Sequence, residues 1–197
     1  AAFENYNDLQ VGDMIECLTC MHASAIDQAV TLHYRDLDSS FFAEPRSKIN
    51  KCQRAIGKET QRYIRTQATA LERCWRLVNS GAIEGPCPTP GDGKTQKKIE
   101  VAEAKRVKRI CTKCGGPDKL CGGGDDCGPR DIGFEHNCPN VTIPGGRNCS
   151  GPITNLDNLV ECLGCVAEFQ ALCLDRARIL GLASYPVECN ATATPGD

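Results

Sequence analysis

The stretch from Pro45 to Gly81 reads PRSKINKCQRAIGKETQRYIRTQATALERCWRLVNSG, and it decides which fold to expect. Apolar side chains recur along it at intervals of three or four residues, which is the spacing of one face of an α-helix. These residues are Ile49, Cys52, Ile56, Tyr63, Ile64, Leu71, Cys74 and Val78. Pro45 suits the first turn of a helix, and Gly81 suits the position just after a helix end. We therefore expect one long amphipathic helix here.

Two cysteines of this helix constrain the disulfides. Cys52 and Cys74 lie on one face, but a rise of about 1.5 Å per residue separates them by roughly 33 Å. A disulfide needs Cα atoms within about 7 Å of each other, so these two cysteines cannot pair. Each must join the helix to another segment, and Cys173 must likewise bond outside its own helix. The rest of the connectivity stays open.

Further segments fill out the expected fold. Helical periodicity extends over residues 13–34, 95–113 and 155–180, with Asn155 as the N-cap of the last segment. Residues 115–152 hold most of the glycine and proline and show no periodicity, so we expect loops there, pinned by Cys121, Cys127, Cys138 and Cys149. The expected fold class is mainly α, a disulfide-rich helical bundle with one long amphipathic helix and an irregular Gly/Pro-rich loop region.

Fifteen cysteines in 197 residues are typical of exported proteins, because thiols in the cytosol are kept reduced. Only 5% of the residues are aromatic, so cross-links would supplement a thin core. Three pairs have the CxxC spacing that also suits zinc, namely Cys17/Cys20, Cys111/Cys114 and Cys162/Cys165. The other nine are dispersed: Cys52, Cys74, Cys87, Cys121, Cys127, Cys138, Cys149, Cys173 and Cys189. This dispersion favours disulfides, and the odd total leaves at least one cysteine free or intermolecular.

An internal repeat organises the chain. Residues 13–20, DMIECLTC, match residues 158–165, NLVECLGC, at an offset of 145 residues. The alternative is convergence on a generic amphipathic CxxC helix. The repeat predicts an N-terminal helical element over 1–44 that partly copies 158–180. A disulfide-stapled helical module over 45–189 and a mobile tail over 190–197 would follow.

Several motifs occur in one order along the second part of the chain. They are KCQRAIGK (51–58), ICTKCGG (110–116), IGF (132–134), CPNVTIPGG (138–146) and CSGPI (149–153). Together they resemble the cysteine-rich helical modules of large, uncharacterised exported proteins of environmental Gram-negative bacteria. The resemblance implies export, a recurring module and a structural or surface role, and it brings no established activity.

The residues do not assemble into a recognisable catalytic motif. The three histidines, His22, His33 and His136, have no serine or cysteine beside them in a nucleophile motif. Cysteines in disulfides cannot act as thiolates. Glu16 and Glu161, which precede two of the CxxC pairs, are interpreted as charges on a helix surface. We therefore expect no enzymatic activity.

A calcium site is the one cofactor that the pattern suggests. Asp118, Asp125, Asp126 and Asp131 lie on or beside a glycine-rich segment, and Ca²⁺ accepts six to eight oxygen ligands in irregular geometry. The spacing is not that of an EF-hand. The alternative interpretation is that these aspartates are solvated turn residues.

Net charge and hydropathy limit the classes of partner that we expect. The net charge of −2 predicts no attraction to nucleic acid, and the lack of a long apolar run predicts no membrane span. Residues 94–109 carry seven Lys or Arg against two Glu, which raises the question of polyanions. The favoured interpretation is that these residues form the solvent-exposed face of an amphipathic helix.

These observations lead to two hypotheses for a secreted protein of the extracellular space or cell surface. The first is a non-enzymatic structural protein that assembles with itself into a filament or surface layer. The N-terminal partial repeat would dock head to tail where a neighbour's matching helix sits, and the odd cysteine would supply an intermolecular bridge. The alternative is a monomeric secreted binding module that uses the loops of 115–152.

Overall fold

The computed structural model describes residues 12, 16, 19, 48–179 and 184–190. Residues 16 and 19 are helical. The rest of the helix expected over 13–34 lies outside the described residues, with Cys17, Cys20, His22 and His33, as does most of the tail. Within the part that is described, the expectation of a mainly helical, disulfide-rich fold is confirmed. None of the described helices is both long and apolar enough to cross a membrane.

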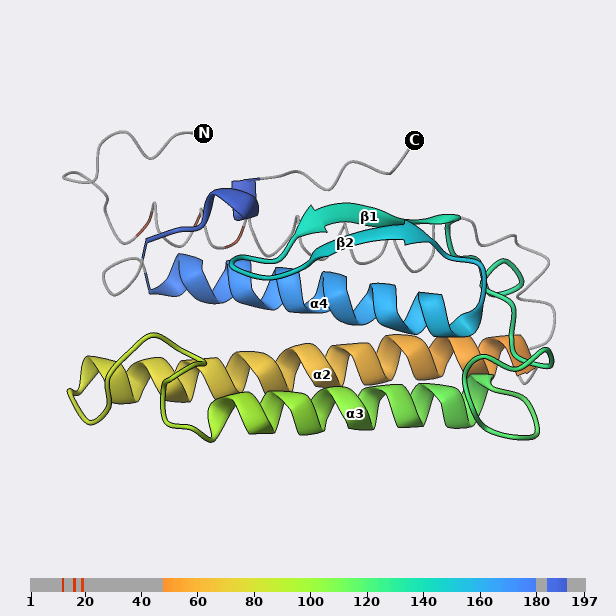
Figure 1. Cartoon of the computed structure of the whole chain (residues 1–197), viewed down its shortest axis with the longest axis horizontal. Helices are drawn as coiled ribbons and strands as arrows, with labels where there is room; N and C mark the ends of the chain where they lie inside the picture. Colours follow the sequence, from red (N-terminus) through yellow and green to blue (C-terminus); the bar gives the residue numbers. More distant parts are fainter. Residues whose placement is uncertain (1–11, 13–15, 17–18, 20–47, 180–183, 191–197) are drawn as a thin grey trace.

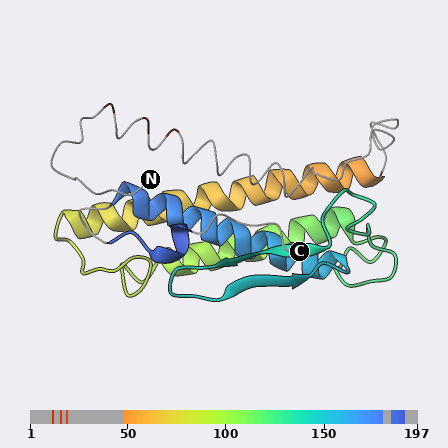
Figure 2. The ribbon, with the colours of Figure 1, turned by 90° about the horizontal axis from the view of Figure 1, so that it is seen from above.

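Three helices and a β-hairpin make up the described fold (Figures 1 and 2). Helices α2 (Lys48–Asn79) and α3 (Thr95–Cys114) run side by side in opposite directions. Helix α4 (Leu156–Arg178) packs against both, and strands β1 (Asn137–Thr142) and β2 (Asn148–Pro152) cover its outer side. A short 3-10 helix, η3 (Val187–Asn190), follows.

Helix ends are set by local hydrogen bonds. Asn155 caps α4, since its side chain accepts a hydrogen bond from the backbone N–H of Asn158 at 2.9 Å. Ahead of α3, Asp92 Oδ1 accepts from the N–H of Thr95 at 2.7 Å. Helix α2 ends at Asn79, and Gly81 follows with a φ of 71°, a conformation that glycine adopts without strain.

The β-hairpin departs from the expectation of loops over 115–152. Its strands are antiparallel, and the register shifts between Cys138 and Val141. Both of these residues are buried although they are three positions apart, because the irregularity interrupts the alternation of a regular strand. A search for period-two patterning therefore misses the strand.

The disulfides follow the geometric limits of the helices. Cys52 bonds to Cys114 and Cys74 bonds to Cys87, so both bonds lead out of α2. The CxxC pairs of α3 and α4 do not close on themselves: the bonds are Cys111–Cys121, Cys138–Cys162 and Cys149–Cys165. Cys173 bonds to Cys189. Cys127 forms no disulfide, so the prediction that it pins the loop region is wrong.

A buried polar contact joins α2 to α4. Trp75 Nε1–H donates a hydrogen bond to Asp175 Oδ2 at 2.8 Å, and both residues are buried. The guanidinium of Arg176 lies 5.1 Å from the Trp75 ring centroid. Burial raises the pKa of the Asp175 carboxyl, although the Trp75 hydrogen bond and the nearby arginines oppose this shift. The charged carboxylate is therefore disfavoured in the folded state.

The stability of the variant Asp175→Asn, measured relative to the wild type, should increase as pH rises. The unfolded Asp175 ionises near pH 4, whereas the folded one ionises only at higher pH. The wild type therefore loses stability across that interval, and the variant does not, while the amide oxygen still accepts from Trp75. Denaturant unfolding at pH 3 and pH 7 measures the difference. A variant whose relative stability falls between these pH values would contradict the argument.

Removal of the long-range disulfide should destabilise more than removal of a local one. Cys52–Cys114 spans 62 residues and Cys111–Cys121 spans 10. Loop-closure entropy gives about 4 kcal/mol for the first bond and about 2.7 kcal/mol for the second. Cys52 and Cys114 are also fully buried, so their loss leaves a cavity. Guanidinium unfolding of the two double-alanine variants should rank them in this order, and the reverse ranking would refute it.

Candidate functional site: an acidic loop between α3 and β1

The loop after α3 brings together three of the four predicted aspartates. Asp118, Asp125 and Asp126 each offer a carboxylate oxygen, and these oxygens lie within 4.8 Å of one another. Asp118 and Asp125 are exposed, while Asp126 is half-buried. Asp131 is not part of this group, because its carboxylate lies against Gly128 instead. The prediction from sequence therefore included one aspartate, Asp131, whose side chain the loop directs elsewhere.

Covalent and polar contacts hold this loop in place. The Cys111–Cys121 disulfide ties its first half to the last turns of α3. At its other end, the N–H of Cys127 donates to the carbonyl of Cys114 at 2.9 Å. Lys48 Nζ, from the start of α2, donates to the backbone carbonyl of Asp125 at 2.7 Å. The carboxylates are therefore presented by a loop with three separate anchors.

Some of the carboxylate oxygens are used inside the loop. Asp118 Oδ1 accepts from the N–H of Leu120 at 2.8 Å. Asp126 Oδ2 accepts from the N–H groups of Gly122 and Gly123 at 2.8 and 3.0 Å. These bonds match the turn-residue interpretation. They leave Asp126 Oδ1, which is buried and has no hydrogen-bond partner in the structure.

The remaining oxygens lie beside Gly123. A Cβ atom at Gly123 would stand 2.8 Å from Asp125 Oδ1, 3.3 Å from Asp118 Oδ2 and 3.5 Å from Asp126 Oδ1. The three oxygens can lie this close to the backbone because residue 123 has no side chain. Three neighbouring carboxylate oxygens are hard donors of the kind that Ca²⁺ prefers, with backbone oxygens and water able to complete its shell. The donor set therefore fits a calcium ion.

The histidine, glutamate and CxxC residues considered in the sequence analysis form no catalytic or metal site in the described part of the chain. His136 is exposed, and Glu161 sits on the surface of α4, where it faces Arg147 at 3.3 Å. The four cysteines of the described CxxC pairs are consumed in disulfides and hold no metal. Burial raises the pKa of the Cys127 thiol, which disfavours the reactive thiolate.

Comparison with known proteins finds no matching family model, no matching curated protein and no matching solved structure. The interpretation of this site therefore rests on its geometry.

The substitution Gly123→Ala should abolish a calcium response while keeping all three carboxylates. Its methyl group would press on the three carboxylate oxygens, the nearest at 2.8 Å, and so change their arrangement. Wild-type protein should melt at a higher temperature with millimolar Ca²⁺ than with chelator, because a ligand that binds only the folded state stabilises it. Gly123→Ala should show no such shift.

Gly124→Ala is the matched control, since a Cβ there meets nothing within 4 Å. It should respond to calcium as the wild type does. A wild type whose melting temperature is unchanged by calcium, or equal responses in the two variants, would rule out the site.

Proposed function

We propose that the chain is a non-catalytic, extracellular structural subunit that assembles with further copies of itself. The observation that carries this proposal is the distribution of the cysteines between paired and unpaired positions. Outside the cell, disulfides persist and compensate for a thin apolar core. Here α2, α3 and α4 each carry at least two disulfide cysteines, which supports a durable structural unit.

The cysteines also suggest where copies would join. Twelve of the 15 form the six described disulfides, which leaves Cys17, Cys20 and Cys127. Cys127 is 6% exposed, so it is poorly placed to bridge two molecules. We therefore assign intermolecular bridging to Cys17 and Cys20 instead.

The repeat supports this assignment. In α4 the matching cysteines, Cys162 and Cys165, bond to Cys138 and Cys149 of the hairpin. The hairpin cysteines are thus already occupied. Partners for Cys17 and Cys20 within the chain are limited to each other and the buried Cys127. A second copy is the simplest source of further partners.

Non-reducing electrophoresis and negative-stain microscopy of concentrated protein test the proposal. Wild type should form a covalent ladder and visible polymers, and Cys17→Ser/Cys20→Ser should lose the ladder. Cys127→Ala should behave as wild type, because its thiol is buried. A wild type that remains a monodisperse monomer without a ladder would overturn self-assembly.

That monomeric outcome would favour the second candidate, a secreted binding module that uses residues 115–152. The specific observation behind it is the exposed acidic loop, whose free carboxylate oxygens face solvent at Asp118 and Asp125. The resemblance to exported bacterial modules implies a structural or surface role, so it favours the first candidate.

A further inference from the structure

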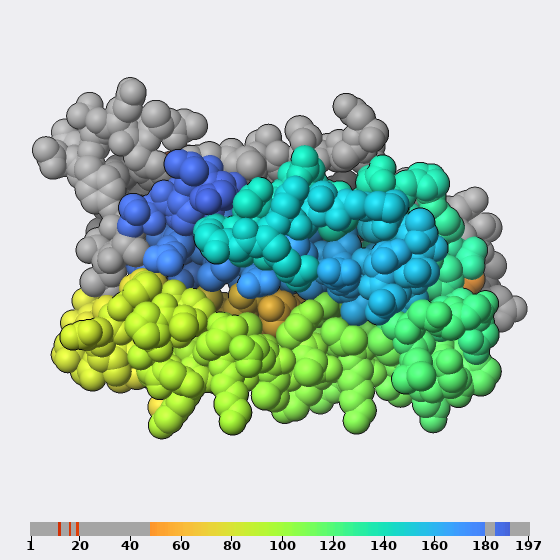
Figure 3. All heavy atoms as spheres, in the orientation of Figure 1, coloured from red at the N-terminus to blue at the C-terminus, as the bar shows by residue number. Residues whose placement is uncertain are grey.

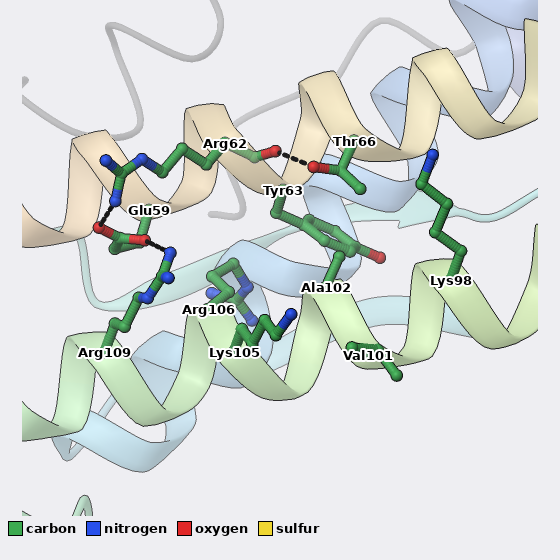
Figure 4. Close-up of a pocket in the computed structure, with 10 residues that line it drawn as sticks. All are labelled: Glu59, Arg62, Tyr63, Thr66, Lys98, Val101, Ala102, Lys105, Arg106 and Arg109. Carbon is green, nitrogen blue, oxygen red and sulfur yellow. Dashed lines mark hydrogen bonds and ion pairs between the residues drawn. The ribbon is translucent and has the colours of Figure 1, made fainter.

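A hollow of about 190 Å³ opens between α2 and α3 (Figure 4). Five cationic side chains and one acidic side chain contribute to its lining. They are Arg62, Lys98, Lys105, Arg106 and Arg109, with Glu59. Pockets that enclose a whole small molecule have volumes of roughly 300–1,000 Å³. This hollow therefore suits a single charged group rather than an entire cofactor.

The one acid in the lining is already paired. Glu59 Oε1 accepts from Arg62 Nη1 at 2.6 Å, and Glu59 Oε2 accepts from Arg109 Nη1 at 3.0 Å. Lys98 and Lys105 are exposed and form no ion pair with any residue that the structure describes. The whole chain has a net charge of −2, so this excess of positive charge is local. An anion would meet uncompensated lysines here.

Arg106 adds a buried donor to the lining. Its side chain is 1% exposed, and it forms a fork with the two carboxylate oxygens of Glu103 at 2.7 and 2.6 Å. Its Nη2 also donates to the carbonyl of Val160 at 2.8 Å. Gly164 of α4 makes room, because a side chain there would collide with Arg106 and Glu103. Arg106 Nη1 is buried and has no acceptor. An oxyanion supplies acceptors of the kind that this nitrogen lacks.

Short and neutral residues keep the hollow open. Ala102 lies between Lys98 and Lys105 on α3, and it lines the hollow beside the Tyr63 ring (Figure 4). Burial raises the pKa of the Tyr63 hydroxyl, so this group stays protonated at neutral pH. The lining thus combines lysine charges, arginine N–H groups and a neutral hydroxyl.

We propose that this hollow binds a phosphate or sulfate group. Arginine forks and lysine charges are the side chains that recognise such oxyanions. The group could arrive as a free ion or as an ester on an acidic polysaccharide, and both sources share the same chemistry. This inference differs from the interpretation of residues 94–109 as a solvent-exposed helix face, because it requires cations from two helices around one cavity. Figure 3 shows side chains along α3 that project from the surface of the fold.

The test compares three variants of the full chain. Lys98→Gln/Lys105→Gln removes the unpaired charges of the hollow. Lys97→Gln/Lys108→Gln removes two exposed lysines of the same helix that do not line it. Ala102→Leu fills the space and keeps every charge. Circular dichroism checks that each variant folds, and calorimetry measures binding of inorganic phosphate, sulfate and a heparin oligosaccharide at fixed ionic strength.

We expect affinity to fall at least about tenfold in Lys98→Gln/Lys105→Gln and in Ala102→Leu, and less than about twofold in Lys97→Gln/Lys108→Gln. This pattern with inorganic phosphate or sulfate identifies a free-ion site, and the same pattern with heparin alone identifies the ester group of a polysaccharide as the ligand. Equal losses in the two lysine pairs, or full binding by Ala102→Leu, would mean diffuse charge attraction and overturn the site. Absence of binding to all three probes would do the same.

Discussion

A disulfide reaches only about 7 Å between Cα atoms, whereas the three described α-helices are rods of 20 to 32 residues. Cysteines far apart on one rod, such as Cys52 and Cys74, therefore cannot pair with each other, and each described helical cysteine bonds outside its own helix. Cys52 joins the start of α2 to the end of α3, and Cys74 joins the other end of α2 to Cys87 in the segment between α2 and α3. The arrangement of the helices follows from these bonds together with the packing between them.

Each of the six described disulfides lies within one of two halves of the fold, and none of them joins the two halves. One half contains α2, α3 and their loops, and the other contains α4, the hairpin and η3. Contacts between the halves are non-covalent. They include the Trp75–Asp175 hydrogen bond and the bond from Arg106 to the Val160 carbonyl. Buried polar side chains therefore fix how the two halves fit, in addition to the apolar core.

The predictable features were those that depend on local sequence. Asn155 could be identified as an N-cap because the capping bond is made within four residues. The hairpin was missed because its irregular register hides the strand pattern, and the bond partners of its cysteines depend on tertiary packing.

The candidate sites show the same difference between what local sequence predicts and what depends on the fold. Residue type indicated the acidic loop, but only the fold reveals that Asp131 turns away and that the other three carboxylates lie close together beside Gly123. In the basic run, sequence could not distinguish Arg106, which is buried, from neighbouring lysines that are exposed. It also could not show that Glu59, from another helix, neutralises part of that charge.

Gly164, which leaves room for Arg106 and Glu103, affects whether the N-terminal repeat can exchange with α4. Gly164 is the variable position of the Glu-Cys-Leu-x-Cys motif, and its counterpart in the N-terminal copy is Thr19. A threonine side chain in the α4 position would meet the arginine and glutamate that already touch the glycine. The N-terminal copy can therefore take the α4 position, in its own chain or in a neighbour, only if the ends of these two side chains move. A copy that docks where a neighbour's matching helix sits must shift this pair.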